Sequence, residues 1–149
     1  MADRYRTRLV VSGDRTLWDP DWGDLCDVPA VVVLIVEDNA LVRMGMSGSL
    51  AEEGFEVLEA SNAAEALAML TGHSAIGMMF TDINMGLGMD GLELAAIVHD
   101  RWPLVQIMVT SGRLDVDVHA LPPGALFVAK PYSQDAVLET MQELVDNWQ

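Results

Sequence analysis

From residue 31 onward, the chain alternates short apolar runs with longer stretches of helical periodicity, and the unit occurs five times. Runs of this length, bounded by polar and glycine residues, are typical of buried strands. Strands that alternate with helices form parallel sheets, because right-handed crossovers carry each helix across a face. The pattern therefore predicts a doubly wound α/β domain with helices on both faces. The apolar runs are 31–36, 55–60, 76–81, 105–110 and 126–129.

The segments between these runs carry helix start and stop signals. In the first of them, the apolar residues Leu41, Val42, Met46 and Leu50 fall on or near one face, which we expect to cover the sheet. The fourth segment is short and rich in acids, and it predicts only a weak helix. The expected helices are 39–53, 62–70, 92–101, 114–120 and 133–148.

The size of the chain is that of one domain with an extra arm. With 149 residues, of which 51% are apolar, it can bury one sizeable core. We expect that domain over 31–149. Residues 1–30 hold turn formers without sustained periodicity and predict a loosely ordered arm, or a start codon placed too far upstream. A docking peptide is the alternative for this segment.

Charge and cysteine content exclude several classes of protein. The net charge is −15, and beyond residue 30 the basic residues are only Arg43, Arg101, Arg113 and Lys130, so no basic stripe can neutralise nucleic-acid phosphates. No apolar run could cross a bilayer, and the N-terminus lacks the pattern of a secretion signal. The single cysteine, Cys26, fits a reducing compartment. We expect a cytoplasmic protein that binds neither nucleic acid nor membrane.

Charged side chains follow three of the predicted strands at the point where each strand ends. Glu37 and Asp38 follow the first run, Asp82 follows the third, and Lys130, the only lysine, follows the fifth. The carboxyl ends of parallel strands meet at one edge of a sheet, where α/β folds place their ligand sites. Three carboxylates and one ammonium are thus predicted to share a pocket. The alternatives are that Asp38 caps a helix and that Lys130 is a solvated loop residue.

Four segments in this order resemble the signature of the response-regulator receiver domain of two-component signalling. They are 33–39, 81–85, 109–112 and 130–132, each at the end of a predicted strand. The resemblance covers about residues 31–148. It implies a flavodoxin-like (βα)5 sandwich with strand order 2-1-3-4-5, whose switch point lies between the first and third strands.

The resemblance also implies a chemistry. Asp82 would be the nucleophile that takes a phosphoryl group from a phosphohistidine on a sensor histidine kinase or phosphotransfer protein. Because a carboxylate repels a phosphoryl group, a hard cation must bridge them, and Mg²⁺ with oxygen ligands suits that task. The implied ligands are Asp38 and Asp82, Glu37 through a water, and the backbone carbonyl of Asn84. Lys130 would pair with a phosphoryl oxygen.

A hydroxyl and an aromatic ring complete the family's switch. Aligning the fourth strand so that a small residue follows the hydroxyl selects Ser111, with Thr110 as the alternative. The rotating aromatic, three residues before the lysine, is Phe127. The resemblance implies that a downstream protein, or a second copy of the chain, binds the face built from 114–148, with Phe127 and Tyr132 as aromatic anchors.

The sequence departs from the family pattern in two places. The loop after Asp82 has Gly86 where a proline is usual, and it is one residue longer before Asp90. The stretch from Gly112 to Lys130 is short. Both departures bear on the lifetime of a phosphorylated form and on the output surface.

Three functions follow as expectations. The first is a single-domain response regulator, because the chain ends just after the fifth helix, and such a protein would not be a turnover enzyme. The second is a Mg²⁺-dependent phosphohydrolase with Asp82 as nucleophile. Enzymes of the haloacid dehalogenase type place a second acid two residues after the nucleophile, where this chain has Asn84. The third is an interaction module of the same fold that is never phosphorylated.

Overall fold

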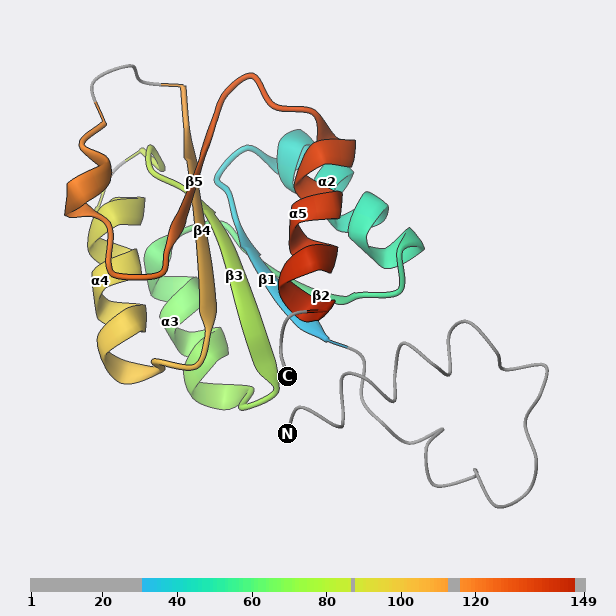
Figure 1. Ribbon diagram of the computed structural model, residues 1–149. Helices are drawn as coiled ribbons and strands as arrows, with labels where there is room; N and C mark the ends of the chain where they lie inside the picture. The colour runs from blue at the N-terminus through green and yellow to red at the C-terminus, as the bar shows by residue number, and fades with distance from the viewer. Residues whose placement is uncertain (1–30, 87, 113–115, 147–149) are drawn as a thin grey trace.

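The computed structural model describes residues 31–86, 88–112 and 116–146. Its centre is a sheet of five parallel strands in the order β2-β1-β3-β4-β5, so the predicted doubly wound, flavodoxin-like topology is confirmed (Figure 1). The arm expected over 1–30 lies outside the described residues. The strands are β1 (Val32–Val36), β2 (Glu56–Ala60), β3 (Ile76–Asp82), β4 (Gln106–Ser111) and β5 (Leu126–Ala129).

Helices cover both faces of the sheet. In Figure 1, α3 and α4 lie on one face and α2 and α5 on the other. Within the described ranges, none of the helices combines the length and the hydropathy that a membrane span needs. The helices are α2 (Ala40–Glu52), α3 (Ala63–Gly72), α4 (Gly91–Arg101) and α5 (Gln134–Asp146), with a short 3₁₀ helix, η3 (Val118–Ala120).

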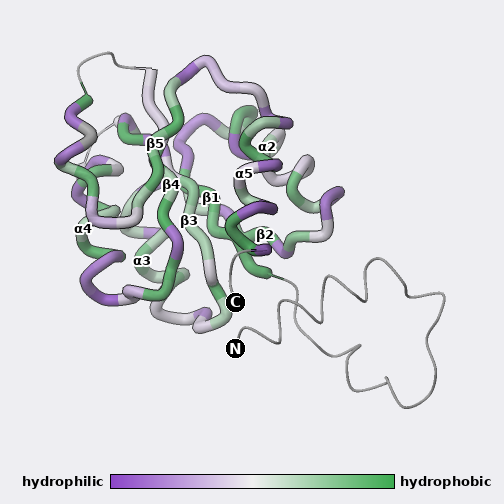
Figure 2. The backbone as a smooth tube through the Cα atoms, in the orientation of Figure 1, coloured by the Kyte–Doolittle hydropathy of each residue, from purple (hydrophilic) through white to green (hydrophobic). Residues whose placement is uncertain are grey.

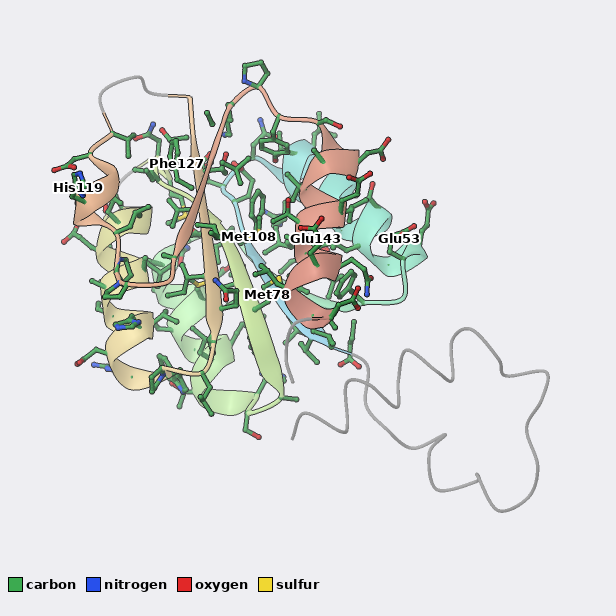
Figure 3. All side chains as sticks on the ribbon, in the orientation of Figure 1. Glu53, Met78, Met108, His119, Phe127 and Glu143 are labelled. Carbon is green, nitrogen blue, oxygen red and sulfur yellow. The ribbon has the colours of Figure 1, made fainter. Side chains whose placement is uncertain are left out.

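The sheet separates two apolar cores. Successive residues of a strand point to opposite faces, so Val33 and Ile35 of β1 join the core under α2 and α5, while Leu34 joins the core under α3 and α4. Figure 2 shows apolar residues along the strands of the sheet. Figure 3 shows Met78 and Met108 on the side of α5. Because both faces of β1 and β3 are covered, these strands are the rigid base of the carboxyl edge.

Two helix predictions differ from the structure. The predicted apolar face of α2 is buried only at Met46 and Leu50, whereas Leu41 is 82% exposed and Val42 is 40% exposed. Both exposed residues belong to the first turn of the helix, next to the carboxyl edge rather than over the sheet. The weak helix expected over 114–120 is reduced to η3, and residues 113–115 lie outside the described part of the chain.

Candidate functional site

The carboxyl edge of the sheet brings together three of the predicted site residues. Lys130 follows β5, and its Nζ lies 2.6 Å from Oδ2 of Asp82 at the end of β3. The same Nζ lies 4.0 Å from Oε1 of Glu37, which follows β1. An ammonium and two carboxylates therefore share one pocket, whereas the sequence predicts three carboxylates there. A solvated loop position for Lys130 is wrong, because its side chain is two-thirds buried and ion-paired.

Asp82 is held by the strand that carries it. Its side chain is only 7% exposed. Oδ2 accepts the hydrogen bond from Lys130, and Oδ1 accepts one of 3.1 Å from the backbone N–H of Asn84. The next backbone N–H, that of Ile83, donates to the carbonyl of Thr110 on β4 at 3.0 Å. The carboxylate is thus fixed in position, and its negative charge is balanced by an ammonium.

The backbone behind Asp82 approaches the start of α4 very closely at Gly91. The N–H of Gly91 donates to the carbonyl of Ile83 at 2.9 Å. A Cβ built on Gly91 would lie 2.2 Å from the carbonyl oxygen of Asp82 and 2.8 Å from Cα of Ile83. Only glycine fits between α4 and the strand end, so this residue sets the position of Asp82 from behind. The sequence offers one signal for it, the Asp90-Gly91 pair before a helix.

Glu37 is the second buried carboxylate. Burial raises its pKa from the ordinary value of 4.5 to about 7, against the lowering effect of the backbone N–H of Asn39. That N–H donates to Oε2 of Glu37 at 3.1 Å, while Asp82 raises the pKa further and Lys130 lowers it. Burial alone would lower the pKa of Lys130, but the hydrogen bond and the charge of Asp82 raise it. Near neutral pH the carboxyl of Glu37 is therefore partly protonated, whereas Lys130 keeps its positive charge.

Asp38 lies at the solvent side of the pocket. Its side chain is exposed, and its Oδ2 is 3.7 Å from the position of a Cβ on Gly86, in the loop after β3. The alternative of Asp38 as a helix cap is wrong, because the side chain of Asn39 accepts from the N–H groups of Leu41 and Val42 and caps α2. The side chain of Asp38 therefore does not cap α2, and it lies at the rim of the pocket.

The oxygen donors at this edge are of the chemical type that binds a hard divalent cation. Glu37, Asp38 and Asp82 supply carboxylates, and Asn84 supplies a backbone carbonyl, which are the ligand types that Mg²⁺ takes. Across the ranges that the structure describes, no three acidic, histidine or cysteine side chains converge closely enough to form a metal site. Lys130 instead neutralises Asp82.

The two candidate hydroxyls lie on opposite faces of β4. Thr110 is on the face of Met108, and its Oγ1 donates to the carbonyl of Val128 at 2.7 Å. Ser111 is fully buried and lies on the face of Val109. Its carbonyl accepts the backbone N–H of Lys130 at 2.9 Å. In the strand ladder Ser111 is paired with Ala129, the residue before Lys130.

The two predicted aromatic anchors also lie on opposite faces. Phe127 is paired with Val109 and packs on the core under α3 and α4 (Figure 3). Tyr132 packs on the core under α2 and α5, where its ring meets that of Phe80 edge-on, with centroids 5.8 Å apart and planes at 84°. The two rings therefore do not form one patch. The contact between Phe80 and Tyr132 was not predicted, because no local pattern links residues that meet only through tertiary packing.

Comparison with known proteins gives the same assignment. The family model of the response regulator receiver domain matches residues 33–142. The response regulator protein FleR of Pseudomonas aeruginosa is 34% identical over 113 residues, which are 74% of this chain and 24% of FleR. The chain therefore spans about a quarter of the length of this curated relative.

Solved structures agree with the family model. A response regulator receiver protein from Sinorhizobium medicae has a TM-score of 0.74 at 25% identity, over 80% of this chain and 98% of that one. The response regulator TrrA from Thermotoga maritima, crystallised in complex with Mg²⁺-BeF, has a TM-score of 0.66 at 25% identity, over 76% of this chain and 98% of that one. The chain thus belongs to the response regulator receiver domain family of two-component signalling.

Proposed function

We propose that this receiver domain accepts a phosphoryl group on Asp82 from a phosphohistidine of a histidine kinase or phosphotransfer protein. The observation that carries the proposal is the 2.6 Å pairing of Asp82 with Lys130, the only lysine of the chain, at the sheet edge. A nucleophilic carboxylate must be fixed and partly dry, and its surplus charge must be balanced until the phosphoryl group arrives. Asp82 meets these conditions.

The transfer balances with the groups present. A carboxylate oxygen of Asp82 attacks phosphorus, and a P–O bond forms as the P–N bond to the donor imidazole breaks. The donor ring carries a proton on its other nitrogen, so when the electron pair of the broken bond stays on the nitrogen that held phosphorus, the donor leaves as a neutral imidazole. Lys130 then passes from the carboxylate to a phosphoryl oxygen within reach of the same Nζ. The domain takes up one group per cycle and is an acceptor rather than a turnover enzyme.

A Mg²⁺ ion is part of the proposal. Asp38 and Asp82 would hold it directly, Glu37 through a water and Asn84 through its backbone carbonyl. When bound, the ion supplies charge neutralisation between the carboxylate and the phosphoryl oxygens. The oxygen donors of these residues support this assignment in kind, because carboxylates and carbonyls are the ligand types that Mg²⁺ takes. The complex of TrrA with Mg²⁺-BeF supports it by analogy.

The exposed apolar residues near the start of α2 support a protein as the phosphoryl donor. Leu41 and Met44 are 82% and 60% exposed, and Val42 reaches the rim of the site beside Lys130. Exposed apolar side chains gathered at a site mark a contact surface for another macromolecule. We expect Leu41→Ser to slow transfer from a phosphohistidine protein and to leave phosphorylation by a small phosphodonor unchanged. Leu104→Ser is the matched control, because Leu104 is 89% exposed just before β4, at the opposite, amino-terminal edge of the sheet.

Signalling would follow from the hydroxyl and the ring on the face of α4. Ser111 lies on the same face as Val109, the partner of Phe127 in the sheet. If Ser111 turns to the phosphoryl group, Phe127 can pack into the space it leaves, and the surface of 116–146 changes. A downstream protein or a second copy of the chain would bind that surface. Because Tyr132 lies on the other face, Phe127 is the aromatic residue of this output surface.

Incubation with a small acyl phosphate and Mg²⁺, followed by intact mass, separates the three functions. A single adduct that decays slowly supports the receiver proposal. Multiple turnover of the phosphodonor with no adduct at steady state would indicate the phosphohydrolase. The absence of both adduct and turnover would indicate an interaction module that is not phosphorylated.

A further inference from the structure

Two contacts join β3 to the turn between β5 and α5. The first is the ion pair between Asp82 and Lys130. The second is the edge-on contact between the rings of Phe80 and Tyr132. Phe80 precedes Asp82 by two residues, and Tyr132 follows Lys130 by two. The ring pair therefore links the same two segments as the ion pair and lies directly beside it.

The stem of Lys130 has room to move on its solvent side. A hollow of about 530 Å³ borders it, and its lining residues are Val42, Gly112, Lys130, Pro131 and Tyr132. The side chain of Lys130 is 32% exposed. A long, flexible ammonium next to such a hollow loses side-chain entropy when it is held in one position, and that loss must be offset by neighbouring contacts.

The ring of Tyr132 has the burial and charge state to supply such a contact. It is half-buried in the core under α2 and α5, and it forms one wall of the hollow. Burial raises the pKa of its phenol above 10, against the lowering effect of Lys130, so the group stays neutral at neutral pH. A neutral ring braced on β3 restrains the turn without adding a charge to the pocket.

We propose that Tyr132 is a positioning residue, whose ring, braced on Phe80, holds Lys130 in reach of Asp82 and of an incoming phosphoryl group. The inference rests on the proposed function for its meaning in phosphorylation. Its structural content, the restraint of Lys130 by an aromatic pair, can be measured without any phosphodonor. The ring rather than the hydroxyl carries the effect, because the contact with Phe80 is made by the ring.

The single lysine makes a direct experiment possible. Protein labelled with ¹³C-lysine gives one set of lysine NMR signals, those of Lys130. At fixed pH and without phosphodonor, ¹³Cε relaxation should show a restrained side chain in the wild type and in Tyr132→Phe, and a mobile one in Tyr132→Ala. Leu138→Ala is the matched control, because Leu138 packs on the same core from α5 and its loss should leave Lys130 restrained. An equally restrained Lys130 in Tyr132→Ala would overturn the proposal.

A kinetic cycle tests the consequence. Tyr132→Ala should slow phosphorylation by a small acyl phosphate roughly two- to tenfold, the range that the loss of one aromatic pair gives. In a Lys130→Met background the same substitution should have no further effect, whereas a general structural defect would slow both backgrounds alike. Equal slowing in both backgrounds would refute the inference. If the wild type itself takes up no phosphoryl group, the proposed function fails, and the relaxation measurement alone decides the role of Tyr132.

Discussion

Gly91→Ala is the substitution whose effect the structure fixes most closely. The added Cβ would lie 2.2 Å from the carbonyl oxygen of Asp82, 2.8 Å from Cα of Ile83 and 2.9 Å from the carbonyl carbon of Asp82. All three are backbone atoms, so no side chain can turn away to make room. Relief requires that α4 and the end of β3 separate by about 1 Å, since carbon contacts are ordinarily near 3.5 Å or more.

The separation has two costs. Overpacking of a core ordinarily costs about 1–3 kcal/mol, and here it falls on backbone. The hydrogen bond from Gly91 to the carbonyl of Ile83, 2.9 Å long, would be strained or lost, at about 1 kcal/mol more. We expect Gly91→Ala to lower the free energy of unfolding by about 2–4 kcal/mol. For a chain of this size, the melting temperature should fall by roughly 5–15 °C.

Urea denaturation followed by circular dichroism measures this change. Gly48→Ala is the matched control, because Gly48 lies inside α2 and an added Cβ would meet no heavy atom within 4 Å apart from the neighbouring backbone of its own helix. There the same substitution should stabilise the protein by about 0.5–1 kcal/mol through helix propensity. The two variants should thus shift in opposite directions. A Gly91→Ala protein as stable as the wild type would refute the argument that this glycine sets the position of Asp82.

Three further predictions concern the pocket and its strand. Folding raises the pKa of Glu37 from 4.5 to about 7, so between these pH values the folded state binds more protons than the unfolded state. Without divalent cations, the free energy of unfolding should therefore fall as pH rises through that window. Urea titrations should show a weaker pH dependence in Glu37→Gln. Millimolar Mg²⁺ should raise the melting temperature more than NaCl of matched ionic strength does. At a hundredfold excess over its dissociation constant, the gain corresponds to about 2.7 kcal/mol. If Mg²⁺ raises the melting temperature of Asp38→Ala as much as that of the wild type, Asp38 is not a ligand. The Ser111→Ala variant should still accept the phosphoryl group, but phosphorylation should no longer change hydrogen exchange over 116–146. The Thr110→Val variant should lose about 1 kcal/mol of stability, because its hydrogen bond to the carbonyl of Val128 is removed. In that variant, phosphorylation should still change hydrogen exchange over 116–146.

The sheet and the composition of its edge could be predicted because they depend on strong and local signals. The runs 31–36 and 76–81 are apolar enough to be buried on both faces, and such strands must be parallel and central. Once the strands are parallel, the meeting of Glu37, Asp82 and Lys130 at one edge follows from topology alone. This is why three residues far apart in the sequence could be placed together correctly.

Side-chain burial and contacts could not be predicted where they depend on the position at which a helix or strand ends and on the residues that pack against it. Leu41 and Val42 continue the apolar pattern of α2, yet they are exposed because the first turn of the helix lies next to the carboxyl edge. The sequence does not report where a helix leaves the sheet. Likewise, the contact of Tyr132 with Phe80 requires the path of the turn after β5, which no periodicity encodes.

The central claim is that Asp82 is the residue that takes up the phosphoryl group. Intact mass of the wild type and of Asp82→Asn, after incubation with a small acyl phosphate and Mg²⁺, tests it most directly. The amide keeps the shape of the side chain but removes the nucleophile, and circular dichroism would show that the fold is retained. The wild type should gain one phosphoryl group and the variant none. An undiminished adduct on Asp82→Asn would contradict the account.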